Sequence, residues 1–318
     1  MKTAYLLIVA TAVLWSGMEV ALKFVAGDFN PIQLTFTRVL IGGAILFPLA
    51  RRSLKKRGRK LDGAALCRFA ALGFLGIAVS MSINQLAVMY APATVVSSIA
   101  VSNPIFTAAF AALILREPVS KWKLMSLLLA IAGIVVIIAP WNLELSLPGV
   151  LYSLLAPLTF SLYGVLSRRD CERYGGATVT SFCFVFGALE LMAFAAMSHI
   201  PAADSLLRSA GLDIFASIPF LSGYTLEALP YFLYIAVGAT GIGFCCYFSA
   251  MEKSTALHAS LAFFLKPVMA PVYAFFLLGE RIEENVFAGI VIMLACLALF
   301  VLPELVQTHK KDKARRAD

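Results

Sequence analysis

The sequence predicts an all-α integral membrane protein in which ten transmembrane helices form two five-helix inverted repeats. Hydrophobic residues make up 61% of the 318-residue chain and charged residues 14%, whereas a soluble globular domain has about 45–50% and about 25%. The apolar residues form ten runs, and each run is close to the roughly 20 residues that a helix needs to cross the hydrocarbon core. The runs are continuous, which excludes a transmembrane barrel because barrel strands alternate apolar and polar residues.

The expected spans follow from these runs in chain order. We expect helices at residues 4–23, 32–50, 69–89, 93–115, 124–140, 148–167, 178–199, 229–249, 255–278 and 285–303.

The first five spans are separated by turns and basic segments. The first span is longer than the hydrophobic region of a cleaved signal peptide, so we expect it to remain in the protein. Short turns at 28–31 and 90–92 join the first span to the second and the third to the fourth, which makes these pairs antiparallel neighbours. The basic segment Arg51–Lys60 ends the second span, and Arg116 ends the fourth.

The second five spans repeat this organisation. The sixth span ends at Arg168, and the seventh leads into the long 200–228 connection, where we expect residues 206–215 to form a short amphipathic helix on the membrane surface. Lys253 lies in the short connection between the eighth and ninth spans, and a basic tail follows the tenth. We therefore divide the chain into a first repeat (1–140), a second repeat (141–303) and a cytoplasmic tail (304–318).

The placement of positive charge predicts the orientation. If ten helices are threaded through the membrane, 21 of the 26 Lys and Arg residues lie on one side. The positive-inside rule puts that side, and both termini, in the cytoplasm of a cell with the protein in its inner membrane. The basic segment then contacts anionic lipid headgroups. The net charge of +8 is thus explained without a nucleic-acid partner.

An internal duplication supports the two repeats. A shift of 163 positions places Asn103-Pro104 on Lys266-Pro267 and Glu117 on Glu280, and a shift of 145 places Ser16 on Ser161. Because each unit has an odd number of helices, the second enters the membrane from the opposite side, which is the arrangement used for alternating access. We expect the two glutamates to hold loops against the neighbouring arginines, Arg116 or Arg281.

These residues resemble a known family. Several segments resemble an EamA-type member of the drug/metabolite transporter superfamily: Leu14-Trp15-Ser16-Gly17, Pro31 and Arg38, and the paired stretches Ser102–Glu117 and Lys266–Arg281, which carry a glutamate at equivalent positions near their ends. The resemblance covers about 300 residues. It implies a ten-helix carrier with a central cavity between its halves, commonly an exporter of amino acids or other small metabolites.

Ionisable residues within the spans are functional candidates because a charge near the bilayer centre costs about 2.5–3.5 kcal/mol or more. Lys266 and Glu190 both lie near the midplane. Lys266 precedes Pro267, whose ring distorts a helix. Two interpretations stay open: Lys266 binds an anionic group of the substrate, or it pairs permanently with Glu190 as a structural bridge.

A second charged group lies nearer the external side. Glu19 and Lys23 are four residues apart and can meet on one helix face, and Arg38 enters the second helix from the same end. The group either closes the external mouth, or Glu19 is a proton-coupling carboxylate whose exposure alternates. Lys23 alone can also extend to the interface.

The remaining candidates are polar or aromatic residues of the spans. Phe263 and Tyr273 share a helix face with Lys266, Asn84 either lines the cavity or bonds to a neighbouring helix, and Trp15 either packs or stacks on a substrate. The substrate-binding candidates are Lys266, Asn103, Trp15, Phe263, Tyr273, Ser97, Tyr163 and Asn84. The ion-coupling candidates are Glu19, Arg38 and Glu190.

These observations favour a secondary active transporter, a proton-coupled exporter of amino acids or other small polar metabolites by alternating access. The alternative is a multidrug exporter that binds lipophilic cations through Glu19, against which Lys266 argues by repulsion. No Walker sequence and no His-Glu-x-x-His pattern occur, so we expect no enzyme, metal or cofactor. The expected partners are a small-molecule substrate and membrane lipid, with the chain as a monomer or homodimer.

Overall fold

The computed structural model describes residues 2–25, 27–91, 93–139, 146–279 and 284–314. Within these ranges, the side chains at 19, 93–95, 97, 274, 278 and 304–314 lie outside the description. The described residues form helices and loops without a β-strand. Ten of the helical segments are long and apolar enough to cross a membrane, and each overlaps one predicted span, which confirms the all-α membrane fold.

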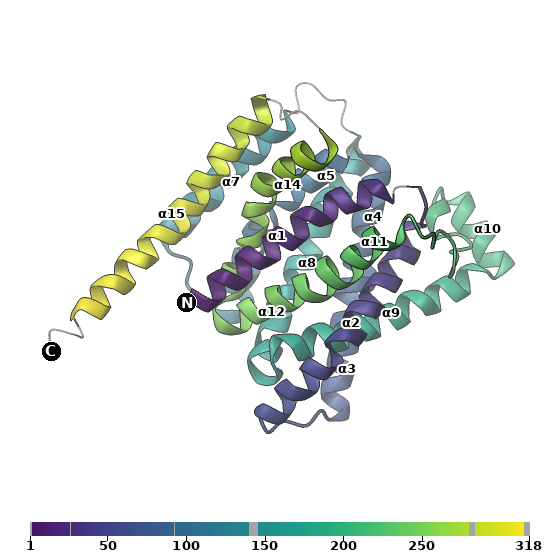
Figure 1. Ribbon diagram of the computed structural model, residues 1–318, viewed down its shortest axis with the longest axis horizontal. Coiled ribbons are helices and arrows are strands. Elements are labelled where there is room, and N and C mark those ends of the chain that lie inside the picture. Colours follow the sequence, from purple (N-terminus) through teal and green to yellow (C-terminus); the bar gives the residue numbers. More distant parts are fainter. Residues whose placement is uncertain (1, 26, 92, 140–145, 280–283, 315–318) are drawn as a thin grey trace.

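The helices extend beyond the predicted apolar runs at several polar ends (Figure 1). In chain order they are α1 (Lys2–Phe24), α2 (Pro31–Lys56), α3 (Gly63–Gly73), η1 (Phe74–Val79), α4 (Ser80–Tyr90), α5 (Ala93–Ala100), α6 (Asn103–Phe110), η2 (Ala111–Leu115), α7 (Lys121–Ile138), α8 (Leu147–Tyr174), α9 (Gly176–Ser198), α10 (Pro201–Ser209), η4 (Asp213–Phe215), α11 (Leu229–Leu233), η5 (Tyr234–Gly243), α12 (Phe244–Lys253), α13 (Ala256–Ala259), α14 (Ala262–Leu278) and α15 (Glu284–Ala314).

Side-chain caps define several helix starts. The Asn30 Oδ1 atom accepts from the N–H groups of Ile32 and Gln33 at the start of α2, where Pro31 needs no donor partner. Asp62 caps α3 in the same way, and Ser146 caps α8. These caps satisfy backbone N–H groups that have no partner inside the helix, so the turns between spans are fixed by local sequence.

The fourth and ninth predicted spans are interrupted helices. A turn at residues 101–102 separates α5 from α6, and a turn at 260–261 separates α13 from α14. Pro104 starts α6, a position where proline is tolerated. We expected Pro267 to distort the ninth span. However, α14 continues through this residue, and the interruption, at residues 260–261, lies six residues earlier.

The third and eighth spans contain π-helical segments. Residues 74–79 form η1, and residues 234–243 form η5. Adding the sequence shift of 163 to 74–79 gives 237–242, which lies inside η5. The spacing seen in the sequence therefore recurs as the same backbone irregularity in the two halves.

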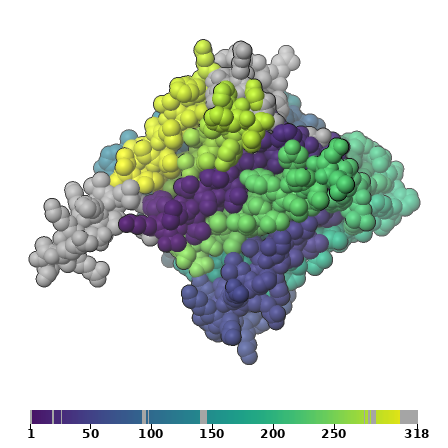
Figure 2. Space-filling view, in the orientation of Figure 1, coloured from purple at the N-terminus to yellow at the C-terminus, as the bar shows by residue number. Residues whose placement is uncertain are grey.

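Close helix packing holds the bundle together. α2 packs along α9, and α7 packs along α15 (Figure 1). A Cβ atom on Gly43 would lie 2.9 Å from the Ser181 carbonyl oxygen, and one on Gly73 would lie 2.5 Å from the Cys183 carbonyl oxygen, so α2 and α3 approach α9 through glycine. α1 crosses one face of the molecule between the α14 side and the α11–α12 side (Figure 2).

Candidate functional site

Five aromatic rings from both halves of the chain meet in the middle of the bundle. We call Trp15, Phe160, Phe244, Tyr247 and Phe263 the aromatic cluster. The Trp15 ring centroid lies 4.7 Å from that of Phe244, 5.2 Å from that of Tyr247 and 5.4 Å from that of Phe263. All but Phe160 are buried, and the Trp15 indole N–H donates to the Ala239 carbonyl oxygen at 3.2 Å.

The cluster brings together three predicted binding residues. Trp15 and Phe263 are members of it, and the Tyr163 ring lies 5.8 Å from that of Phe160. In this conformation the three side chains contact protein on all sides, with exposed fractions of 4%, 8% and 0%. They form a closed layer across the interior.

Arg38 lies one helical turn beyond this layer. Its Nη1 atom donates to Thr240 Oγ1 at 3.0 Å, and its Nη2 atom lies 3.3 Å from the Met81 sulfur. Thr240 lies in η5 and precedes Phe244 by four residues, so the Arg38 guanidinium lies about one helical turn from the aromatic cluster, on the side away from the basic end. Arg38 is 7% exposed, so a cation is held within the bundle between residues of α2, α4 and η5.

Lys266 has the same depth on α14. It follows Phe263 by three residues, on the side of the aromatic cluster where Arg38 lies. The chain is buried from 256 to 264 and half-buried or exposed from 265 to 273, so Lys266 and Tyr273 are more accessible than Phe263. On η5, the Tyr234 hydroxyl donates to the Leu14 carbonyl oxygen at 3.1 Å.

Glu190 stands apart from these cations. It is half-buried in α9, and its Oε2 atom is inaccessible and has no hydrogen-bond partner among the described residues. Within that part of the chain no ion pair links it to Lys266. The permanent bridge that the sequence analysis left open does not occur in this conformation.

The two predicted asparagines differ in their surroundings. Asn103 is fully buried. Its Nδ2 atom donates to the Pro157 carbonyl oxygen at 3.3 Å and its Oδ1 atom accepts from Thr107 at 3.2 Å, so its amide joins α6 to α8. Asn84 is half-buried in α4, and in the described part of the chain its amide makes no hydrogen bond. The side chains of two further candidates, Glu19 and Ser97, lie outside the described residues.

Three ion pairs join the two halves at one end of the bundle, which we call the basic end. They are Arg57–Glu252, Arg68–Asp170 at 2.6 Å and Arg168–Glu117 at 3.8 Å, and we call them the ionic seal. Each pair has one partner in residues 1–140 and one in 141–303. The seal therefore closes the bundle between its halves.

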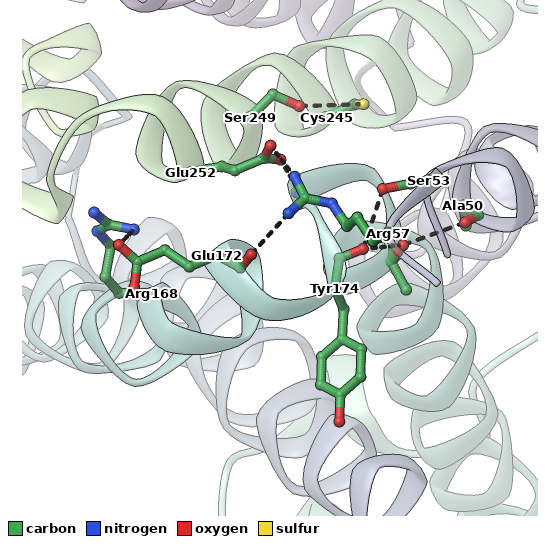
Figure 3. A network of polar contacts seen from close by, with 11 residues as sticks. Ala50, Ser53, Arg57, Arg168, Glu172, Tyr174, Cys245, Ser249 and Glu252 are labelled. Atoms are coloured by element: carbon green, nitrogen blue, oxygen red, sulfur yellow. Dashed lines mark hydrogen bonds and ion pairs between the residues drawn. The ribbon is translucent and has the colours of Figure 1, made fainter. Parts of the chain in front are cut away.

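Figure 3 shows the network of polar contacts around Arg57 and Glu252. Its Oε1 atom accepts from Arg57, and its Oε2 atom accepts from the Gly176 N–H at 2.7 Å. Arg57 also donates to the Glu172 carbonyl oxygen at 2.8 Å. One carboxylate thus ties the end of α12 to the end of α2 and to the start of α9.

Glu117 has a different partner from the one expected. We expected Glu117 and its repeat mate Glu280 to lie against Arg116 or Arg281. The structure pairs Glu117 with Arg168 instead. Residues 280 and 281 lie outside the described part of the chain. Burial raises the pKa of Glu117, and Arg168 opposes this shift.

At the opposite end, the contacts between α2 and the 199–228 connection are neutral. Gln33 exchanges two hydrogen bonds with Ser222, at 2.8 and 3.0 Å, and Tyr224 donates to Thr37 at 2.8 Å. These bonds hold the 199–228 connection against α2. Sequence reasoning missed the contacts at both ends because their partners lie at least 51 residues apart in the sequence and carry no motif.

Two pockets in the described residues lie away from these polar groups. The larger, of about 340 Å³, is an apolar groove between α1, α13–α14 and α15 that includes Ile8, Leu265 and Leu297. Neither pocket includes a predicted site residue. The candidate site is therefore the set of polar groups beyond the aromatic cluster: Arg38, Asn84, Thr240, Lys266 and Tyr273.

Comparisons with known proteins place the chain among transporters. The sequence model of the EamA-like transporter family matches residues 2–139 and 147–302. A Clostridium kluyveri protein named as an uncharacterized transporter is 32% identical over 302 residues, 92% of this chain and 91% of that protein. Protein PecM of Dickeya dadantii is 24% identical and covers 92% of this chain and 90% of its own length. One solved structure matches with a TM-score of 0.73 at 20% identity, covering 95% of this chain and 97% of that one, which shows a shared fold.

Proposed function

This chain belongs to the EamA-like transporter family, and we propose that it is a proton-coupled exporter of amino acids or other small polar metabolites that works by alternating access. The family and the names of the relatives point to a membrane transporter rather than an enzyme. The substrate class, the coupling ion and the mechanism are our proposal, and the following observations support them.

The unequal closure of the two sides of the aromatic cluster carries the proposal. Toward the basic end, the interior is buried and crossed by the ionic seal. Toward the opposite end, Lys266, Tyr273 and Asn84 are half-buried. A carrier must close one side of its site while the other is accessible. We assign this conformation to the state closed at the basic end.

Two cations beyond the aromatic cluster favour an anionic or zwitterionic substrate. Arg38 and Lys266 each lie one turn from the cluster, and charge-assisted hydrogen bonds to a carboxylate are stronger than neutral ones. A lipophilic cation would be repelled there. We therefore propose that Lys266 binds the substrate carboxylate and that Arg38 lies at the same depth in the bundle. Tyr273 and Asn84 then line the accessible side of the site.

Glu190 and Glu19 are the residues proposed for proton coupling. Proton binding needs one carboxylate rather than a cage of oxygen ligands. Glu190 presents an inaccessible oxygen without a hydrogen-bond partner among the described residues, and protonation is the simplest way to reduce the cost of such a group. Glu19 lies one helical turn from Trp15 on α1.

We also propose the orientation. The basic end carries most of the Lys and Arg residues outside the spans, so it faces the cytoplasm by the positive-inside rule. The accessible side then faces outward from the inner membrane. The repeats 1–140 and 141–303 are the two bodies that move against each other, and residues 304–318 follow as a cytoplasmic tail.

Counterflow in proteoliposomes tests the substrate assignment. Purified protein would be assayed with amino acids, organic acids and quaternary amines, at two internal pH values. We expect Lys266→Ala to lose uptake of carboxylate substrates, whereas Lys253→Ala, which removes an exposed cation at the basic end, retains it. Full uptake by Lys266→Ala, or uptake of quaternary amines alone, would contradict the assignment.

The coupling residues are tested in the same vesicles. Glu190→Gln and Glu19→Gln carry no titratable carboxylate, so the residue that couples should lose the dependence of uptake on the pH gradient while keeping exchange at equal pH. If both variants keep the full gradient dependence, neither carboxylate couples protons to transport.

A further inference from the structure

Two buried tyrosine hydroxyls lie between the aromatic cluster and the ionic seal. Tyr163 is 0% exposed and Tyr247 is 1% exposed. In the described part of the chain neither hydroxyl has a hydrogen-bond partner. The buried cysteines Cys171 and Cys183 belong to the same core cluster as the two tyrosines.

These hydroxyls are not explained by packing in the closed conformation. A buried hydroxyl without a partner costs free energy, whereas phenylalanine would fill the same ring space without that cost. The Tyr163 ring is held against Gly76, where a Cβ atom would lie 2.5 Å away. The phenol therefore sits in a fitted site, although its polar atom is unsatisfied there.

Their depth places them on the route that the seal closes. Tyr163 precedes Arg168 by five residues on α8, and Tyr247 precedes Glu252 by five residues on α12. At about 1.5 Å per residue, both hydroxyl layers start about 7–8 Å inside the ionic seal. Tyr247 is the member of the aromatic cluster that follows Phe244 toward the basic end, and the Tyr163 ring lies 5.8 Å from that of Phe160, so both phenols lie at the face of the cluster nearest the seal.

We propose that Tyr163 and Tyr247 form a second polar subsite for the carboxylate of the transported metabolite, hidden in this conformation and exposed when the basic end opens. This rests on the function proposed above and adds a site that acts only in the other half of the cycle. Each phenol can donate one hydrogen bond, so the two tyrosines together can bind the substrate carboxylate before or after it contacts Lys266. Opening of the seal satisfies both hydroxyls, by substrate or by water.

The neighbouring thiols make the layer measurable without a known substrate. Cys171 and Cys183 are both 0% exposed. In protein with the other four cysteines replaced by serine, reaction with N-ethylmaleimide reports how often this layer opens. Because Phe has no hydroxyl to satisfy, the Tyr163→Phe/Tyr247→Phe protein should favour the closed state. Its rate of reaction should be about one fifth of the parent's rate or lower.

The control is Tyr90→Phe, which removes a hydroxyl from an exposed side chain at the opposite end and should react like the parent. An unchanged or faster rate in the double Phe protein would overturn the proposal. This result does not depend on transport, so it stands even if no compound of the counterflow panel is moved and the proposed function fails.

Transport from each side gives the second readout. For a transported amino acid, the double Phe protein should have a KM raised about fivefold or more when substrate is presented at the basic end, and an unchanged KM from the opposite end. An equal change from both sides, or none from either, would show that the phenols do not form a side-specific subsite.

Discussion

Replacing Glu252 by glutamine tests whether the ionic seal sets the closed state. The carboxylate has two oxygen atoms, and each accepts from a different donor, Arg57 or the Gly176 N–H. Glutamine is similar in shape but has one acceptor oxygen, and its NH₂ group would face the second donor. The substitution therefore cannot satisfy both, whichever way the amide is turned.

The free energy that the Glu252→Gln substitution should cost follows from how exposed Glu252 and Arg57 are. A hydrogen bond to a charged group contributes about 1.5–3 kcal/mol. The Glu252 side chain is 18% exposed and that of Arg57 is 30% exposed, so we reduce this for solvent screening to about 1–2 kcal/mol. That corresponds to about a 5- to 30-fold decrease in the ratio of closed to open protein.

Maleimide reaction at Cys171 and Cys183 measures this ratio, and the Glu252→Gln protein should react faster by that factor. The matched control is Glu172→Gln. Glu172 lies at the same end and pairs with Arg168 four residues earlier on the same helix, so its loss removes the same charge without separating the halves. Equal rates in the two variants would refute the role of the seal.

Three further predictions concern the pH response and two close contacts. Burial raises the pKa of Glu117 in the closed state above its usual value of 4.5, so closure should weaken as pH rises from 4.5 through that raised pKa. The ratio of the maleimide rate of the parent protein to that of Glu117→Gln should therefore change with pH, and a flat ratio would contradict this prediction. A Cβ atom on Gly17 would lie 2.3 Å from the Tyr234 hydroxyl oxygen, so Gly17→Ala should cost about 1–3 kcal/mol, and its lower Tm should recover when Tyr234→Phe is added. Gly175 has φ +93 and a Cβ atom there would lie 2.2 Å from a serine hydroxyl oxygen of α2, so Gly175→Ala should lower the Tm further than an alanine on an exposed helix face, and an unchanged Tm would argue against this backbone geometry.

The membrane fold was predictable because the bilayer restricts what can cross it. A spanning segment must satisfy its backbone internally, so hydropathy alone identified ten spans, and the described residues include ten helical segments long and apolar enough to cross a membrane. The interruptions at 101–102 and 260–261 could not be read in the same way. Proline 267 suggested a distortion at its own position, but the turn lies at 260–261, in a stretch that is buried on both sides.

Candidate site residues could be selected from the sequence where one residue carried the signal. Lys266 stood out because a charge in a span is costly, Phe263 was chosen because it shares a helix face with Lys266, and Trp15 because its ring could stack on a substrate. The structure places the Trp15 and Phe263 rings 5.4 Å apart. Tyr247 was missed because nothing in its local sequence distinguishes it from a packing residue. The pairing of Glu252 with Arg57 was also missed, since 195 positions separate the partners and only the folded chain brings them together.

A single helix links the contacts at both ends of the bundle to the cation beyond the aromatic cluster. α2 carries Gln33, which bonds to the 199–228 connection at the opposite end, and Arg38 in the interior, and Arg57 follows it directly at the basic end. Its 26 residues extend about 39 Å, so a tilt that separates Arg57 from Glu252 also displaces Gln33 and Arg38. The basic-end contact is ionic and the contact of Gln33 is neutral, so salt weakens the first and leaves the second almost unchanged. We therefore expect the ionic strength on the basic side to bias α2, and with it the accessibility of the site, toward opening at that end.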